Sequence, residues 1–500
     1  MSTAAGLIAV IAVSLATVAI GAFGLRVSRT TSDFYVASRT VRPLANASAI
    51  SGEYLSAASF LGVAGLILAH GVDALWFPVG FTAGYLVLLV FVAAPLRRSG
   101  AYTIPDFAEV RLQSSAARYT ASLLVVGVSW FYLMPQFQGA GLTLRTATGA
   151  PSWVGSVLVA IIVVINVVSG GMRSITFVQA FQYWLKLSAM LIPLFFLIDK
   201  WRGDGSPAIS RLHAADWVEP LAGPNSIYLT YSIILATFLG TMGLPHVVVR
   251  FYTNPDGRAA RRTTLIVLAL IGSFYLMPTI YGALGRIYSH DLIAGGRTDA
   301  VVLELPGRML GGTTGDILSA LLTAGAFAAF LSTSSGLTMS IAGVVGQDLV
   351  GTRLGKGLSG ITALRLAVIP CILVPLIPAL ATERLAVASS VTFAFALAAS
   401  TFCPLLVLGI WWRSLTARGA IAGLIAGGLC AGIAPILTIA AKPEGWVGVM
   451  LSQPAAWSVP IGFAVMIVGS MADRNGIPAN VARTMVRLHT PERIDVDRRI

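Results

Sequence analysis

The feature that most constrains this chain is a succession of apolar runs, which follow one another along nearly all of its 500 residues. A helix of about 20 apolar residues crosses the hydrocarbon core of a bilayer, which is about 30 Å thick. A backbone in lipid must satisfy its own hydrogen bonds, and these runs lack the alternation that an outer-membrane barrel requires. The sequence therefore predicts an all-α integral membrane protein embedded in a lipid bilayer.

Short polar connections divide the apolar residues into about thirteen spans. The spans lie near residues 6–25, 44–69, 74–95, 117–143, 152–170, 175–198, 227–249, 263–285, 314–345, 361–381, 385–411, 419–440 and 453–472. We expect one transmembrane domain over residues 1–472 and a tail over residues 473–500 that is too short to form a further domain. The bundle of helices must then carry the function.

The formal net charge of +13 does not indicate a nucleic-acid partner, because the basic residues are scattered through short connections. They concentrate in every second connection, as at Arg97, Arg173 and Arg250. The positive-inside rule assigns these connections to the cytoplasm. We therefore expect a multi-pass protein of the plasma membrane with its N-terminus outside and its tail in the cytoplasm.

Two spans contain residues that interrupt helices. The second includes SGEYLSAASFLG (residues 51–62), and the seventh includes Gly240, Gly243 and a proline. The two spans are five apart, as expected for a five-helix unit that occurs twice in inverted orientation, near residues 44–198 and 227–411. The alternative is that glycine and proline are simply common in membrane helices.

Glu53 lies within the second span, where an ionised carboxylate costs on the order of 2.5 to 3.5 kcal/mol on insertion scales. A bound cation or a proton would balance this charge, which makes Glu53 a candidate for ion or proton coupling. The structural alternatives are a buried pair with a basic residue such as Lys186, or a position near the end of the helix. The sequence leaves these alternatives open.

The ninth span carries four adjacent hydroxyl residues, Ser332, Thr333, Ser334 and Ser335. One hydroxyl within a helix usually bonds back to a carbonyl one turn earlier, but adjacent hydroxyls on two faces offer oxygen ligands. A dehydrated alkali cation needs several oxygen donors, and a facing helix that unwinds supplies free carbonyls. The hydroxyl cluster and the interrupted second span together predict a cation site.

Other classes of function fit the sequence less well. The five histidines lack metal partners at useful spacing, the three cysteines lie in apolar segments, and no nucleophile has an adjacent base. We therefore expect neither an enzyme nor a bound cofactor. A channel would use the same oxygens, but a closed site between two repeats favours alternating access.

Several segments resemble the sodium:solute symporter family, and most closely its cation/acetate or monocarboxylate branch. They include SAASFLG (56–62), GGMRSITFVQAFQ (170–182), GTMGLPHVVVRFYTNPDGRAARR (240–262) and FLSTSSGLTMS (330–340). The resemblance covers nearly the whole chain. It implies a leucine-transporter-like fold of two inverted five-helix repeats, in which the second and seventh helices are broken.

By position, the resemblance implies a sodium site made from the carbonyls of Gly52, Leu55 and Ala329 and the side chains of Ser332 and Thr333. It also implies a substrate cavity beside the sodium ion. The residues expected around that cavity are Ser56, Ser59, Gln136, Gln138, Gly240 and Gly243.

The resemblance further implies a secondary active symporter that couples inward sodium movement to uptake of a short-chain monocarboxylate such as acetate, propionate or pyruvate. The positive N-termini of broken helices bind an anion without an arginine, and no arginine lies at the centre of spans two or seven. A small monocarboxylate suits such a site. The alternatives are proton coupling, or sodium symport of another small solute such as an amino acid or a sugar.

Overall fold

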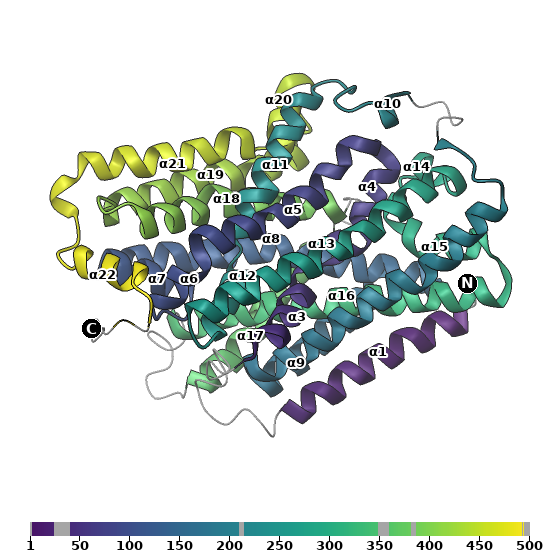
Figure 1. The fold of residues 1–500 in the computed structure, drawn as a ribbon, viewed down its shortest axis with the longest axis horizontal. Helices are drawn as coiled ribbons and strands as arrows, with labels where there is room; N and C mark the ends of the chain where they lie inside the picture. Colours follow the sequence, from purple (N-terminus) through teal and green to yellow (C-terminus); the bar gives the residue numbers. More distant parts are fainter. Residues whose placement is uncertain are drawn as a thin grey trace.

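The computed structural model describes residues 3–24, 41–209, 215–348, 360–381, 387–492 and 494. Within these residues the secondary structure is helical and contains no β-strand (Figure 1). The sequence prediction of an all-α protein is confirmed over this part of the chain.

The helices of the first half are α1 (Thr3–Gly24), α3 (Pro43–Tyr54), α4 (Val63–His70), α5 (Trp76–Val87), α6 (Ala93–Arg98), α7 (Ile104–Leu112), α8 (Ser115–Thr148), α9 (Ser152–Gly203) and α10 (Ala215–Val218). Two π-helical segments, η2 (Ala58–Gly62) and η4 (Leu88–Val92), and the 3-10 helix η3 (Gly71–Leu75) join some of them.

The helices of the second half are α11 (Ser226–Gly243), α12 (Pro245–Val249), α13 (Gly257–Tyr288), α14 (Asp291–Ala294), α15 (Val301–Met309), α16 (Gly312–Val345), α17 (Gly360–Ala381), α18 (Val387–Trp411), α19 (Ala417–Ala441), α20 (Gly445–Ser452), α21 (Ala455–Ala472) and α22 (Val481–His489). The short 3-10 helices are η6 (Arg250–Thr253), η7 (Thr298–Ala300) and η9 (Arg474–Gly476).

Eleven helical segments of the described chain are long and apolar enough to cross a membrane. Two are much longer than one crossing needs: Ala58–Arg98 has 41 residues and Ser152–Gly203 has 52. The second contains a kink at Gly171, whose φ of 60° favours glycine, and the first contains η3. If each of these segments crosses twice, the number of spans is the thirteen that hydropathy predicts, and this count stays a prediction.

The chain leaves helical geometry at both places where the sequence predicts an interruption. In the second span, α3 ends at Tyr54, and Leu55 and Ser56 are not helical. The π-helical segment η2 begins at Ala58. In the seventh, Leu244 has extended backbone between α11 and α12. The two interruptions therefore leave backbone groups free to bond with side chains instead of with their own helix.

Helix α16 forms the centre of the bundle. In the most apolar 18-residue stretch of its helical segment, 89% of the residues are buried. Figure 1 shows it between α9 and α8, with α1 along the outer side of α9. A helix enclosed on all sides can carry polar residues that never meet lipid. Its serine and threonine cluster is accordingly buried inside the protein.

Two features of the fold are not visible in the hydropathy of the sequence. The connection after α13 contains three short helices, of which α15 packs on α16. The predicted tail contains α22, which packs on α6, with the Arg98 guanidinium close to the Glu492 carboxylate. In Figure 1, α14 and α15 lie at the end of the bundle opposite to α6, α7 and α22.

Candidate functional site

The candidate site lies where the interrupted α3 meets α9 and α16. Helix α3 approaches α9 closely because Gly52 has no side chain: a Cβ there would lie 2.1 Å from the carbonyl oxygen of Gln179. Helix α16 approaches α3 in the same way at Gly336, where a Cβ would lie 1.9 Å from Glu53 Oε1. These two glycines allow α3, α9 and α16 to pack closely around a group of buried polar side chains.

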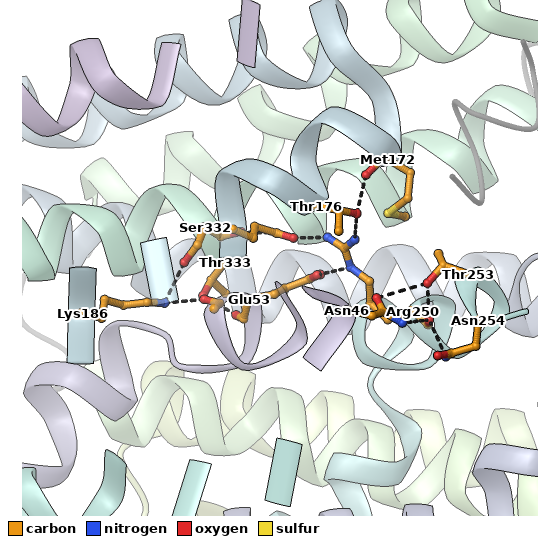
Figure 2. A network of polar contacts seen from close by, with 12 residues as sticks. Asn46, Glu53, Met172, Thr176, Lys186, Arg250, Thr253, Asn254, Ser332 and Thr333 are labelled. Atoms are coloured by element: carbon orange, nitrogen blue, oxygen red, sulfur yellow. Dashed lines mark hydrogen bonds and ion pairs between the residues drawn. The ribbon is translucent and has the colours of Figure 1, made fainter. Parts of the chain in front are cut away.

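The structure brings three predicted sodium ligands together around the side chain of Lys186. The Lys186 ammonium donates hydrogen bonds to the carbonyl of Gly52, to Leu55 O at 2.8 Å and to Ser332 Oγ at 2.9 Å (Figure 2). Lys186 extends from the second half of α9 and is fully buried. A positive group therefore lies within the predicted cation site and is part of the chain itself.

The other two predicted ligands lie beside this group. The hydroxyl of Ser332 donates to Ala329 O at 3.0 Å, so both residues belong to one turn of α16. The hydroxyl of Thr333 donates to the carbonyl of Glu53 at 2.6 Å, which joins α16 to the last turn of α3. All the predicted ligands thus lie at one junction.

Glu53 is paired with Arg250, and not with Lys186 as the structural alternative from the sequence has it. Arg250 Nε lies 2.7 Å from Glu53 Oε2, and both side chains are buried. The guanidinium also donates to Thr176 Oγ1 at 2.8 Å and to the side-chain oxygen of Gln179. Buried charges of opposite sign that are hydrogen-bonded in this way are tolerated inside a membrane protein.

Gln179 continues this network from Arg250 to the cation site. Its amide nitrogen donates to the carbonyl of Ser332 at 2.8 Å. Figure 2 shows Lys186 bonded to Ser332, Thr333 beside Glu53, and Glu53 paired with Arg250. Glu53, Arg250 and Lys186, in their ordinary ionised forms, together carry one net positive charge.

The two interrupted helices also contact each other directly. The hydroxyl of Tyr54, at the end of α3, lies 2.7 Å from Thr241 Oγ1 near the end of α11. On the other side of the break, the N–H of Ala57 donates to Gln136 Oε1 of α8 at 3.0 Å. Gln136, a predicted substrate residue, is therefore occupied in holding the unwound segment.

The remaining predicted substrate residues fall into separate places. Ser56 is buried in the break, and Ser59 Oγ lies 2.8 Å from the hydroxyl of Tyr275. Gly240 and Gly243 face the backbone of α18 instead of a cavity, since a Cβ on either would lie 2.4 Å from a carbonyl oxygen of α18. Gln138 lines the large cavity described next.

A cavity of about 1080 Å³ lies between the end of α8, α15 and the start of α16. It is at the end of the bundle that carries α14 and α15, and Gln138 and Thr323 are among its lining residues. Its charged lining residues are Arg145, Arg297, Asp299, Glu304, Arg308 and Asp316. Since both signs of charge are present, the lining of the cavity does not favour an anion through its charge alone.

Sequence reasoning missed three residues of the site. The sequence presents Lys186 only as a partner for Glu53, and Arg250 only as one of the basic residues of a connection. His246, directly after the seventh-span break, is fully buried, and neither ring nitrogen has a hydrogen-bond partner among the described residues. Its ring meets Tyr132 edge to face, with centroids 5.2 Å apart. The signal available in the sequence for His246 is its position directly after the proline of the break.

Comparison with known proteins identifies the family and the fold. The sequence model of the sodium:solute symporter family matches residues 34–427, which is most of the chain. The chain belongs to the sodium:solute symporter family. This membership makes it a multi-pass membrane transport protein and not an enzyme, and it implies a small solute and sodium as the transported species.

Two relatives match the symporter over nearly its whole length. An uncharacterized symporter of Bacillus subtilis, YwcA, is 31% identical and the match covers 95% of this chain and 96% of the relative. A monocarboxylic acid transporter of Corynebacterium glutamicum is 30% identical, with 90% and 88% of the two chains covered.

Among solved structures, the symporter shares its fold with a Na+-coupled sialic acid symporter in a substrate-bound outward-open state. The TM-score is 0.69 at 14% identity, and the match covers 93% of this chain and 98% of the other. At this identity the likeness concerns the fold alone.

Proposed function

We propose that this protein is a secondary active symporter that couples inward movement of a cation to uptake of a short-chain monocarboxylate such as acetate, propionate or pyruvate. Two five-helix repeats, near residues 44–198 and 227–411, would rock about the interrupted α3 and α11–α12 to give alternating access. With the orientation that the positive-inside rule predicts, the cavity beside α15 opens to the outside.

The observation that carries this proposal is the contact between the two interrupted helices beside the oxygen cluster. Tyr54 bonds Thr241, and Glu53 pairs with Arg250, so the two helices meet at their breaks. The hydroxyls of Ser332 and Thr333 lie at the same junction. A positive charge held here, whether a bound ion or the proton carried by Lys186, would therefore bias the arrangement of both helices, which is what coupling requires.

A small monoanion suits the charge of this junction. The network of Glu53, Arg250 and Lys186 has one net positive charge, which one carboxylate would balance. The free polar groups beside the break, including the ring nitrogens of His246, are potential donors to it. The monocarboxylic acid transporter among the relatives supports the same class of solute.

Two coupling ions are candidates. The family and the predicted ligands favour sodium. The position of the Lys186 ammonium among those ligands favours the second candidate, a proton. One cation moving with one monoanion carries no net charge, so the ion's concentration ratio alone would drive uptake.

The test is uptake of radiolabelled acetate into proteoliposomes, with the sodium gradient and the pH gradient imposed separately. Saturable uptake that follows either gradient, and exchange with acetate on the far side, would support the symporter. Absence of saturable acetate, propionate and pyruvate uptake under both gradients would refute it.

A further inference from the structure

We propose that the Lys186 ammonium is the built-in cation of the oxygen site formed by α3 and α16, so that this site binds no sodium ion. The inference deepens the proposed symport and rests on it for its consequence in transport. It assigns to a side chain of α9 the place that the sequence resemblance gives to sodium.

The hydrogen bonds around the amine fit its charged form. The carbonyls of Gly52 and Leu55 can only accept hydrogen bonds, and the hydroxyl hydrogen of Ser332 is donated to Ala329 O. Each of the three bonds around the amine therefore needs a hydrogen from Lys186. A neutral amine has two hydrogens and an ammonium has three, so only the ammonium satisfies all three acceptors.

The position of the ammonium leaves no room for a metal ion on the same ligands. Its nitrogen lies 2.8 Å from Leu55 O and 2.9 Å from Ser332 Oγ, distances typical of charge-assisted hydrogen bonds. A sodium ion bound by the same oxygens would have to occupy the volume that the ammonium fills.

Electrostatics act in the same direction. Glu53 is neutralised by Arg250, so the ammonium is left without a carboxylate among its hydrogen-bond acceptors. A sodium ion added beside it would place two like charges together in a buried site, where repulsion is strong. A solute carboxylate would instead lower the net charge of the site to zero. The arrangement thus favours an anion and disfavours a second cation.

The test is thermal unfolding of the purified full-length protein in NaCl and in choline chloride, at equal ionic strength and pH. We expect the same Tm in both salts for the unaltered protein. Lys186→Ala removes the ammonium and keeps the oxygens, so NaCl should raise its Tm by about 2 °C or more. Adding Ser332→Ala to that variant should abolish the rise.

Lys200→Ala is the matched control, since Lys200 is at the far end of the same helix and pairs with Asp204. Its Tm should be equally indifferent to sodium. A Tm of the unaltered protein that differs between the two salts would overturn the proposal. So would a folded Lys186→Ala variant with the same Tm in both salts. If Lys186→Ala fails to fold, the comparison of Tm in NaCl and in choline chloride for the unaltered protein still tests the proposal. These readouts need no solute, so they are independent of the acetate uptake that tests the proposed function.

Discussion

Arg250 and Glu53 join the two interrupted helices through a buried ion pair, with Arg250 Nε 2.7 Å from Glu53 Oε2. Arg250 directly follows α12, and Glu53 precedes the break in α3 by two residues. The large cavity lies beyond the breaks, at the end of the bundle formed by α15 and the end of α8. The pair therefore lies on the side of the breaks away from the cavity.

Removing one partner of this pair should be much worse than removing both. Arg250→Gln leaves the Glu53 carboxylate buried without its counter-charge, which costs about 3–5 kcal/mol, and we expect a large fall in Tm and loss of acetate uptake. The double variant Glu53→Gln/Arg250→Gln removes both charges, so its Tm should recover much of the loss. A double-mutant cycle on Tm measures this coupling, and additive effects would contradict it.

Gly336 should be required because it leaves room for the Glu53 carboxylate. A Cβ at this position would lie 1.9 Å from Glu53 Oε1, so Gly336→Ala must displace the carboxylate or separate α16 from α3. We expect a loss of about 1–3 kcal/mol, together with loss of uptake. Gly127→Ala is the matched control, because nothing lies within 4 Å of a Cβ there. It should be neutral or slightly stabilising.

How far the sequence predicts this site depends on how local each signal is. The breaks after α3 and between α11 and α12 are indicated by glycine and proline in or near the segments themselves, and the structure has them where expected. The buried hydroxyls of Ser332 and Thr333 stand out in the same way within one apolar helix. Hydropathy does not reveal α15, because it is averaged over about 19 residues and α15 is an amphipathic helix of nine.

Pairings between distant residues could not be predicted from the sequence. Lys186 reaches a carbonyl 134 positions earlier in the chain, and Arg250 reaches a carboxylate 197 positions earlier. Arg250 is near the end of an apolar run, which suggests a loop residue, yet tertiary packing buries it completely. Hydropathy measures an average over a window, and it contains no information on which helices pack together.

The hydroxyl of Thr333 should matter through its bond to the carbonyl of Glu53, which is 2.6 Å long and joins α16 to α3. Thr333→Val keeps the shape of the side chain but leaves this buried carbonyl without its donor, at a cost of about 1–3 kcal/mol. We expect lower Tm and lower uptake. Thr333→Ser keeps the hydroxyl and should resemble the unaltered protein. Equal behaviour of the two variants would show that the bond has no role.

His246 should contribute to binding the solute and little to folding. Its ring is fully buried, both nitrogens lack partners in the described part of the chain, and its edge-to-face contact with Tyr132 needs only an aromatic ring. His246→Phe keeps that contact and removes the ring N–H donor, so we expect an unchanged Tm and a KM for acetate that is about tenfold to a hundredfold higher, since one hydrogen bond to a charged group contributes about 1.5–3 kcal/mol. Initial rates of acetate uptake over a range of concentrations, measured beside thermal unfolding of the same preparation, separate the two roles. A lower Tm with an unchanged KM would assign His246 to packing, and the solute would then have to be bound by other groups beside the break.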